Sequence, residues 1–143
     1  MKNYISIGLI LLIIFACSTT KTNIAGLKES EKLKSDTIKI ANEALEYEIT
    51  IIDAGFSNWF NFNAKPRNFY SQDYFETRNK IWVNEWNIRA MQPSIYNSNS
   101  YEMRIDYEPN INYGYEVNYM LFNYLNYFQI VNNIKLGVFA PRI

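Results

Sequence analysis

The sequence predicts an α+β fold in which a small three-stranded antiparallel sheet is covered by two main helices. Polar and apolar residues alternate along residues 37–41, 45–51 and 101–107, which is the pattern of strands with one buried face. Residues 72–92 and 115–132 are longer stretches with apolar side chains at helical spacing. The chain has 143 residues, is 48% hydrophobic and shows no internal repeat, which favours one folded domain over two domains or disorder.

The first two strands should form a hairpin, because residues 42–44 between them have the composition of a turn. The side chains expected on its buried face are Ile38, Ile40, Leu45, Tyr47, Ile49 and Ile51. A two-stranded hairpin alone is marginally stable in water. We therefore expect residues 101–107 to supply the third strand, with Met103 and Ile105 among its buried side chains.

Three helices are expected after the hairpin. The first is a short aromatic segment at residues 56–62. The second covers residues 72–92, with Ser71 as its N-cap, Asp73 favourably placed in its first turn, and Pro93 beyond its end. The third covers residues 115–132 and is apolar on nearly every side, which predicts deep burial. Residues 138–143 then form a short tail.

The N-terminus has the features of a bacterial lipoprotein signal peptide. Lys2 precedes residues 5–16, an uncharged stretch that as a helix would rise about 18 Å, short of the roughly 30 Å hydrocarbon core. Ile14, Phe15, Ala16 and Cys17 then match a lipobox, although Phe15 replaces the usual small residue. Cys17 is the only cysteine, and its thiol is the group that would be acylated. An uncleaved signal anchor and an ordinary secretory cleavage are the alternatives.

This interpretation divides the chain into three parts. Residues 1–16 are the signal peptide, residues 17–35 are the lipidated Cys17 and a polar, flexible tether, and residues 36–143 are the single α+β domain. As a coil the tether would have a reach of about 25 Å. Several acyl chains anchor a protein stably to a membrane that it does not span. Ser18 after the cysteine favours the outer membrane, and the lack of acidic residues at 18–23 favours its periplasmic face.

The composition excludes several kinds of site. The chain has no histidine and one cysteine, which excludes internal disulfides, Cys/His zinc sites and histidine-dependent nucleophilic catalysis. Its net charge is zero, and it carries no local motif for dinucleotides, phosphates, calcium or esterase chemistry. We therefore predict no cofactor, no metal, no nucleic-acid partner and no enzymatic activity.

A carboxylate-dependent hydrolase is the enzymatic alternative. Such an enzyme needs only two carboxyl groups, about 5–9.5 Å apart. The acidic residues of the second half that could supply them are Glu85, Glu102, Asp106, Glu108 and Glu116. Three of these surround the expected third strand, where solvent exposure is the simpler explanation.

The aromatic content, 17% of the residues, allows a second alternative. Exposed rings could stack on the sugar faces of a glycan or peptidoglycan fragment, and the candidates are Trp59, Trp82, Trp86, Tyr113, Tyr115 and Tyr119. The spacing of Trp82 and Trp86 on the inward stripe favours core packing instead. The abundance of asparagine and tyrosine is typical of a genome low in GC and needs no functional explanation.

The lipobox, the polar tether and residues 36–60, 65–87 and 101–128 together resemble a family of small Bacteroidetes lipoproteins of unknown function. The resemblance covers nearly all of the chain from Asp36. It implies the class of protein and its compartment, and it implies no activity, ligand or site residue. From the anchor and an aromatic-rich domain that lacks catalytic constellations, we expect a lipid-anchored structural or protein-interaction component of the envelope that faces the periplasm.

Overall fold

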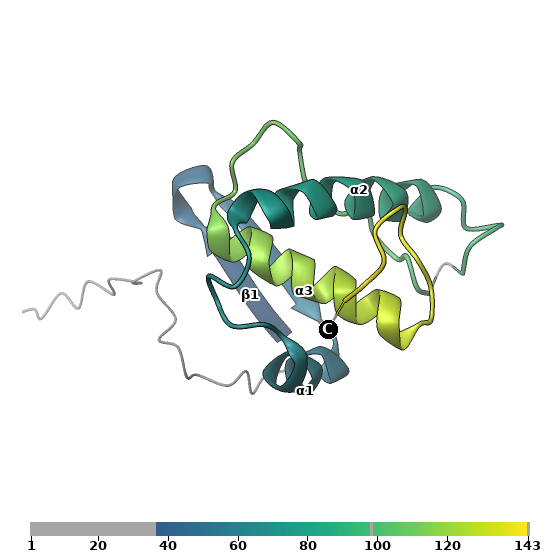
Figure 1. Cartoon of the computed structure of the whole chain (residues 1–143). Coiled ribbons are helices and arrows are strands. Elements are labelled where there is room, and N and C mark those ends of the chain that lie inside the picture. Colours follow the sequence, from purple (N-terminus) through teal and green to yellow (C-terminus); the bar gives the residue numbers. More distant parts are fainter. Residues whose placement is uncertain (1–36, 98, 143) are drawn as a thin grey trace, which may run out of the picture.

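The computed structural model describes residues 37–97 and 99–142, which form two strands and three helices (Figure 1). The elements are β1 (Thr37–Asn42), the 3-10 turn η1 (Glu43–Leu45), β2 (Tyr47–Ile52), α1 (Ala54–Asn63), α2 (Gln72–Ala90) and α3 (Tyr115–Val131). The predicted signal peptide, Cys17 and the tether lie outside the described residues. Within the described part, no helix has the length and apolar character needed to cross a membrane.

The predicted hairpin is confirmed. β1 and β2 pair antiparallel, in a register that runs from Thr37 opposite Ile52 to Asn42 opposite Tyr47. Ile38 and Ile51 are buried on the inward face. Leu45, which was expected inward, is 43% exposed because it lies in η1, where the strand alternation does not apply.

The predicted third strand is wrong, because the sheet of the described residues contains β1 and β2 only. Residues 101–107 are extended, but side chains of α2 bind their backbone groups. The indole of Trp86 donates to Met103 O at 2.8 Å, and the Asn87 amide donates to Ile105 O at 2.9 Å and accepts from Ile105 N at 2.8 Å. The Tyr47 hydroxyl donates to Asp106 O, so a side-chain hydrogen bond, rather than a backbone ladder, joins this segment to β2. Met103 is 78% exposed.

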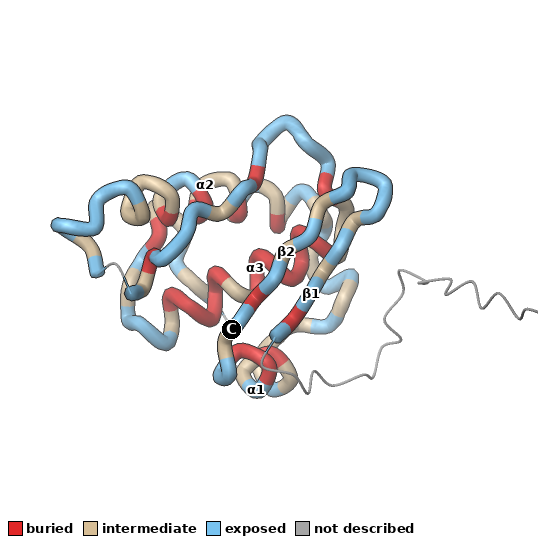
Figure 2. Tube along the Cα trace, turned by 180° about the vertical axis from the view of Figure 1, so that it is seen from behind, coloured by how far each residue is buried: buried red, intermediate tan, exposed pale blue. Residues whose placement is uncertain are grey.

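The helices are confirmed close to their predicted bounds, and their arrangement places α3 at the centre. α3 contacts both strands, α1 and α2. Figure 2 shows the buried residues concentrated along α3, behind the hairpin. The two long helices therefore pack chiefly on each other, and α3 rather than a three-stranded sheet forms the centre of the core.

Candidate functional site

The most distinctive surface of the described residues is a row of stacked rings and one guanidinium along the start of α2. We call it the arginine–aromatic ladder, and it consists of Phe69, Tyr70, Tyr74, Arg78 and Phe139. Tyr70, Tyr74 and Arg78 are spaced by four residues, so they lie on one side of α2 and of the turn before it, since side chains four apart on a helix are neighbours. Phe139 joins them from the C-terminal segment.

The members of the ladder cover one another's faces. The rings of Tyr70 and Tyr74 are nearly parallel, 3° apart with centroids at 4.0 Å, and Phe69 meets Tyr70 edge to face at 4.7 Å. The Arg78 guanidinium carbon lies 3.4 Å from the Tyr74 centroid and 4.6 Å from the Phe139 centroid. The Tyr74 ring is therefore covered by Tyr70 and by Arg78, whose Nη1 also donates to Tyr74 O at 3.3 Å.

The first turn of α3 holds the N-terminal half of the ladder. The Tyr115 hydroxyl donates to Tyr70 O at 3.3 Å and accepts from Asn68 N at 2.7 Å. Arg67 forms an ion pair with Glu116, with 2.8 Å between Nε and Oε1. These contacts fix the loop that precedes Ser71. The Ser71 hydroxyl accepts a hydrogen bond from Tyr74 N at 3.2 Å, which confirms Ser71 as the N-cap of α2.

The C-terminal segment carries Phe139, and it is not the simple tail that the sequence suggested. Leu136 is fully buried, and its N–H donates to Gln129 Oε1 at 2.7 Å. The chain then turns at Gly137, which has a φ of +90°. The Trp82 indole donates to Phe139 O at 3.2 Å. Figure 1 shows this segment folding back across α3 towards α2.

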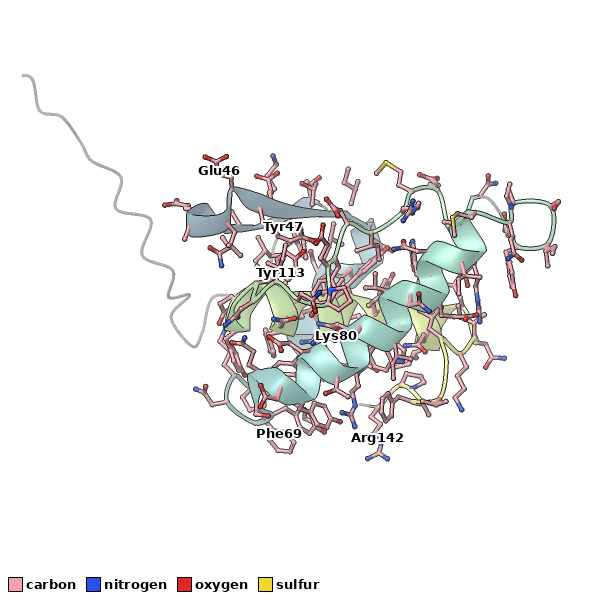
Figure 3. The ribbon with its side chains drawn as sticks, turned by 90° about the horizontal axis from the view of Figure 1, so that it is seen from above. Glu46, Tyr47, Phe69, Lys80, Tyr113 and Arg142 are labelled. Carbon is pink, nitrogen blue, oxygen red and sulfur yellow. The ribbon has the colours of Figure 1, made fainter. Side chains whose placement is uncertain are left out.

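A second arginine lies beside the ladder. The Asn126 amide donates to Arg142 O at 2.5 Å and accepts from Arg142 N at 3.0 Å. Both bonds are to the backbone of Arg142, and its side chain is exposed. Figure 3 shows Phe69 and Arg142 on the side of α2 opposite to Glu46 and Tyr47 of the hairpin. Among the described residues, no carboxylate forms an ion pair with Arg78 or Arg142.

The pKa of Tyr74, in the middle of the ladder, is raised above its ordinary value, mainly by desolvation. The positive charges of Arg78 and Arg142 oppose this rise. The hydroxyl of Tyr74 therefore stays protonated at neutral pH. Arg78 and Arg142 therefore give this surface positive charge that the neutral Tyr74 does not offset.

A buried polar cluster lies on another side of α2, around Asn79 and Asn118, both fully buried. The Asn79 amide donates to Asn118 O at 3.0 Å, and the Tyr107 hydroxyl donates to Asn118 Oδ1 at 2.8 Å. Burial, helped by the negative charge of Glu76, raises the pKa of Tyr107, so its hydroxyl remains a donor. Asn79 Oδ1 has no hydrogen-bond partner among the described residues. The cluster ties α2, α3 and residues 101–107 together, which is a structural role.

The carboxylates considered for a hydrolase are either ion-paired with an arginine or exposed. Glu85 forms an ion pair with Arg89 at 2.8 Å, and Glu116 is paired with Arg67. Glu102, Asp106 and Glu108 are exposed in the loop before α3. In residues 37–97 and 99–142, no group of three or more acidic or cysteine side chains could hold a metal ion.

Most of the aromatic residues considered for glycan stacking belong to the core. Trp82 is 1% exposed and Trp86 6%, and Tyr113 and Tyr119 are also buried. Trp59 is half-buried against Phe56 and Tyr127, and Tyr115 is half-buried too. The preference for core packing of Trp82 and Trp86 is confirmed. Sequence analysis missed the ladder, whose only local signal was the spacing of Tyr70, Tyr74 and Arg78.

Comparison with known proteins places the chain in a family. The model of a family of unknown function, DUF6146, matches residues 4–140. The chain belongs to the DUF6146 family. The match covers nearly the whole chain, and it confirms the expected membership of a family without an assigned function. No curated protein and no solved structure matches the chain.

Proposed function

We propose that this member of the DUF6146 family is a lipid-anchored component of the bacterial cell envelope, acylated at Cys17, with an interaction role rather than a catalytic one. The anchor is supported by the lipobox that ends at Cys17 and by the short uncharged stretch before it. The proposed position is the periplasmic face of the outer membrane, on the basis of Ser18 and the residues that follow.

The arginine–aromatic ladder is the observation that carries the interaction role. The ladder places the half-buried Arg78 and Phe69, which is 58% exposed, on one side of α2, and the exposed Arg142 lies beside it. Guanidinium edges bind carboxylates and phosphates in a planar, bidentate way. Aromatic ring edges are also electropositive. The surface is therefore complementary to an anionic partner.

The same geometry gives less support to glycan stacking. A sugar stacks on a free ring face, and Tyr70 and Arg78 occupy the faces of the Tyr74 ring. The tryptophans that could have formed a stacking platform are half-buried or buried. An anionic surface thus fits the ladder better than a neutral sugar does.

Mass spectrometry of the mature N-terminus tests the anchor. The protein isolated from envelopes should begin at Cys17 and carry acyl chains, and Cys17→Ala should abolish both the acylation and the envelope association. Ser18→Ala is the matched control and should leave acylation intact. A native chain that retains Met1, or one that begins with a free thiol, would refute the anchor.

Photo-crosslinking in cells tests the interaction role. A photoreactive side chain in place of Phe69 should form covalent adducts with the partner of the ladder, and the same group in place of Met103 should form few adducts. Met103 is a suitable control, because it is also strongly exposed and lies in the loop that contacts the hairpin. Equal adduct yields from both positions would contradict an interaction surface on the ladder.

A further inference from the structure

We infer that the arginine–aromatic ladder lies on the phosphate groups of the same membrane that holds the lipid anchor. The inference rests on the proposed function and names the partner of its interaction surface. The domain would then be held to the bilayer twice, by its acylated cysteine and by this side of α2.

The first step of the argument is charge. Arg78 and Arg142 have no carboxylate partner among the described residues, and both lie close enough to Tyr74 to oppose its raised pKa. The Arg78 Nη1 group donates to Tyr74 O at 3.3 Å, so Arg78 offers its remaining N–H groups, while the exposed Arg142 can bind a phosphate oxygen pair, because the geometry of the guanidinium matches phosphate. Phospholipid headgroups present such phosphates as a dense layer.

The second step is the mixed character of the side chains. Phe69 is 58% exposed at the end of the ladder, and Lys65 Nζ lies 6.0 Å from its ring centroid. Tyrosine and arginine each combine an apolar body with a polar tip, which suits the headgroup region of a bilayer. An acidic segment of a protein would match the arginines and would give no special place to Phe69.

The third step is the length of chain between the anchor and the domain. Thr37 begins β1 and is twenty residues after Cys17. Those residues can span at most on the order of 65 Å, so an acylated Cys17 would confine the domain to the membrane surface. At the millimolar effective concentrations that such links produce, even a weak contact is populated.

The test uses the chain from residue 17 onward with Cys17→Ser, which removes the acylation site and leaves the ladder intact. Sedimentation is measured with vesicles of equal parts phosphatidylglycerol and phosphatidylcholine, and with vesicles of phosphatidylcholine alone. The anionic vesicles should bind the chain more strongly. Arg142→Gln should weaken that binding about fivefold, the contribution expected of one arginine at an anionic surface. Phe69→Ser should also weaken it.

Arg104→Gln is the matched control. It removes the same charge from an exposed position in residues 101–107, and it should change vesicle binding much less than Arg142→Gln does. Arg142→Gln should leave the urea midpoint unchanged, because Asn126 binds only the backbone of Arg142. An equal loss in the two variants, or no preference for anionic vesicles, overturns the inference.

Three further outcomes distinguish a failure of this inference from a failure of the proposed function. If soluble polyglutamate binds in an Arg142-dependent way and the vesicles do not, the surface takes an acidic protein segment, and the membrane inference is wrong. If Cys17 is acylated in cells, but Arg142→Gln and Arg104→Gln bind the vesicles equally, only the inference fails. If native Cys17 carries no lipid, the proposed anchor fails, whatever the vesicles show.

Discussion

The side chain of Gln129 ties the C-terminal segment to α3, and its removal tests how much this connection stabilises the domain. Gln129 is 1% exposed and makes two hydrogen bonds to backbone groups. Its Nε2 donates to Leu125 O at 3.0 Å, and its Oε1 accepts from Leu136 N at 2.7 Å. The variant to examine is Gln129→Leu, which nearly preserves the volume and removes both polar atoms.

The expected cost follows from the state of each partner. Leu125 O keeps its main-chain hydrogen bond within α3, so losing the side-chain donor costs little. Leu136 N–H, in a residue that is fully buried, loses its acceptor. A buried donor left without a partner costs about 1–3 kcal/mol. We therefore expect the free energy of unfolding to fall by about 2 kcal/mol, a large part of the stability of a small domain.

Urea unfolding followed by tryptophan fluorescence measures this change, because Trp82 and Trp86 are buried. Asn132→Ala is the matched control. Its amide also donates to a backbone carbonyl, Phe128 O at 2.8 Å, but from an exposed residue at the end of α3. That variant should change stability by only about 0.5 kcal/mol. A Gln129→Leu protein as stable as wild type would refute the proposed role of Gln129.

Three further predictions concern single positions. Gly137→Ala should cost about 1–3 kcal/mol in thermal unfolding, because the φ of +90° disfavours a side chain and the new Cβ would lie 2.7 Å from Ile81 Cγ2; an unchanged Tm would contradict this reason. Ser71→Ala should cost about 1 kcal/mol in urea unfolding through the lost N-cap bond to Tyr74 N, and Ser71→Asp should restore most of it. Burial raises the pKa of Tyr124 to about 12, above its ordinary value of about 10. Since the unfolded state ionises first, stability is complete below pH 10 and falls between pH 10 and 12, and Tyr124→Phe should reduce that fall in urea titrations; an identical pH dependence in the variant would show that this residue is not a cause.

Local patterns determined much of the fold. Alternation predicted the hairpin with Ile38 and Ile51 inward, and helical spacing predicted α2 and α3 to within a few residues. Ser71 was recognisable as an N-cap, since its side chain acts on a backbone group three residues away. These features depend on neighbours in the chain, so the order of the residues is sufficient to predict them.

Such patterns do not predict hydrogen-bond partners that are distant in the sequence. The alternation at residues 101–107 correctly signals an extended segment, but Trp86 and Asn87 of α2 bind its backbone where a strand was expected. The buried asparagines were explained by composition, yet Asn118 and Asn126 hold other segments in place. An amide side chain gives no local sign of which distant backbone group it will bind.

The sequence by itself was sufficient to predict the α+β class, the hairpin and the helices, and the proposal of acylation at Cys17 rests on the sequence alone. Only the tertiary structure decided that the sheet stops at two strands and that Phe139 stacks with Arg78, sixty-one positions earlier in the chain. The physical reason is that periodicity reports which side of a segment avoids water. It does not report which distant group satisfies that segment's hydrogen bonds or covers its rings.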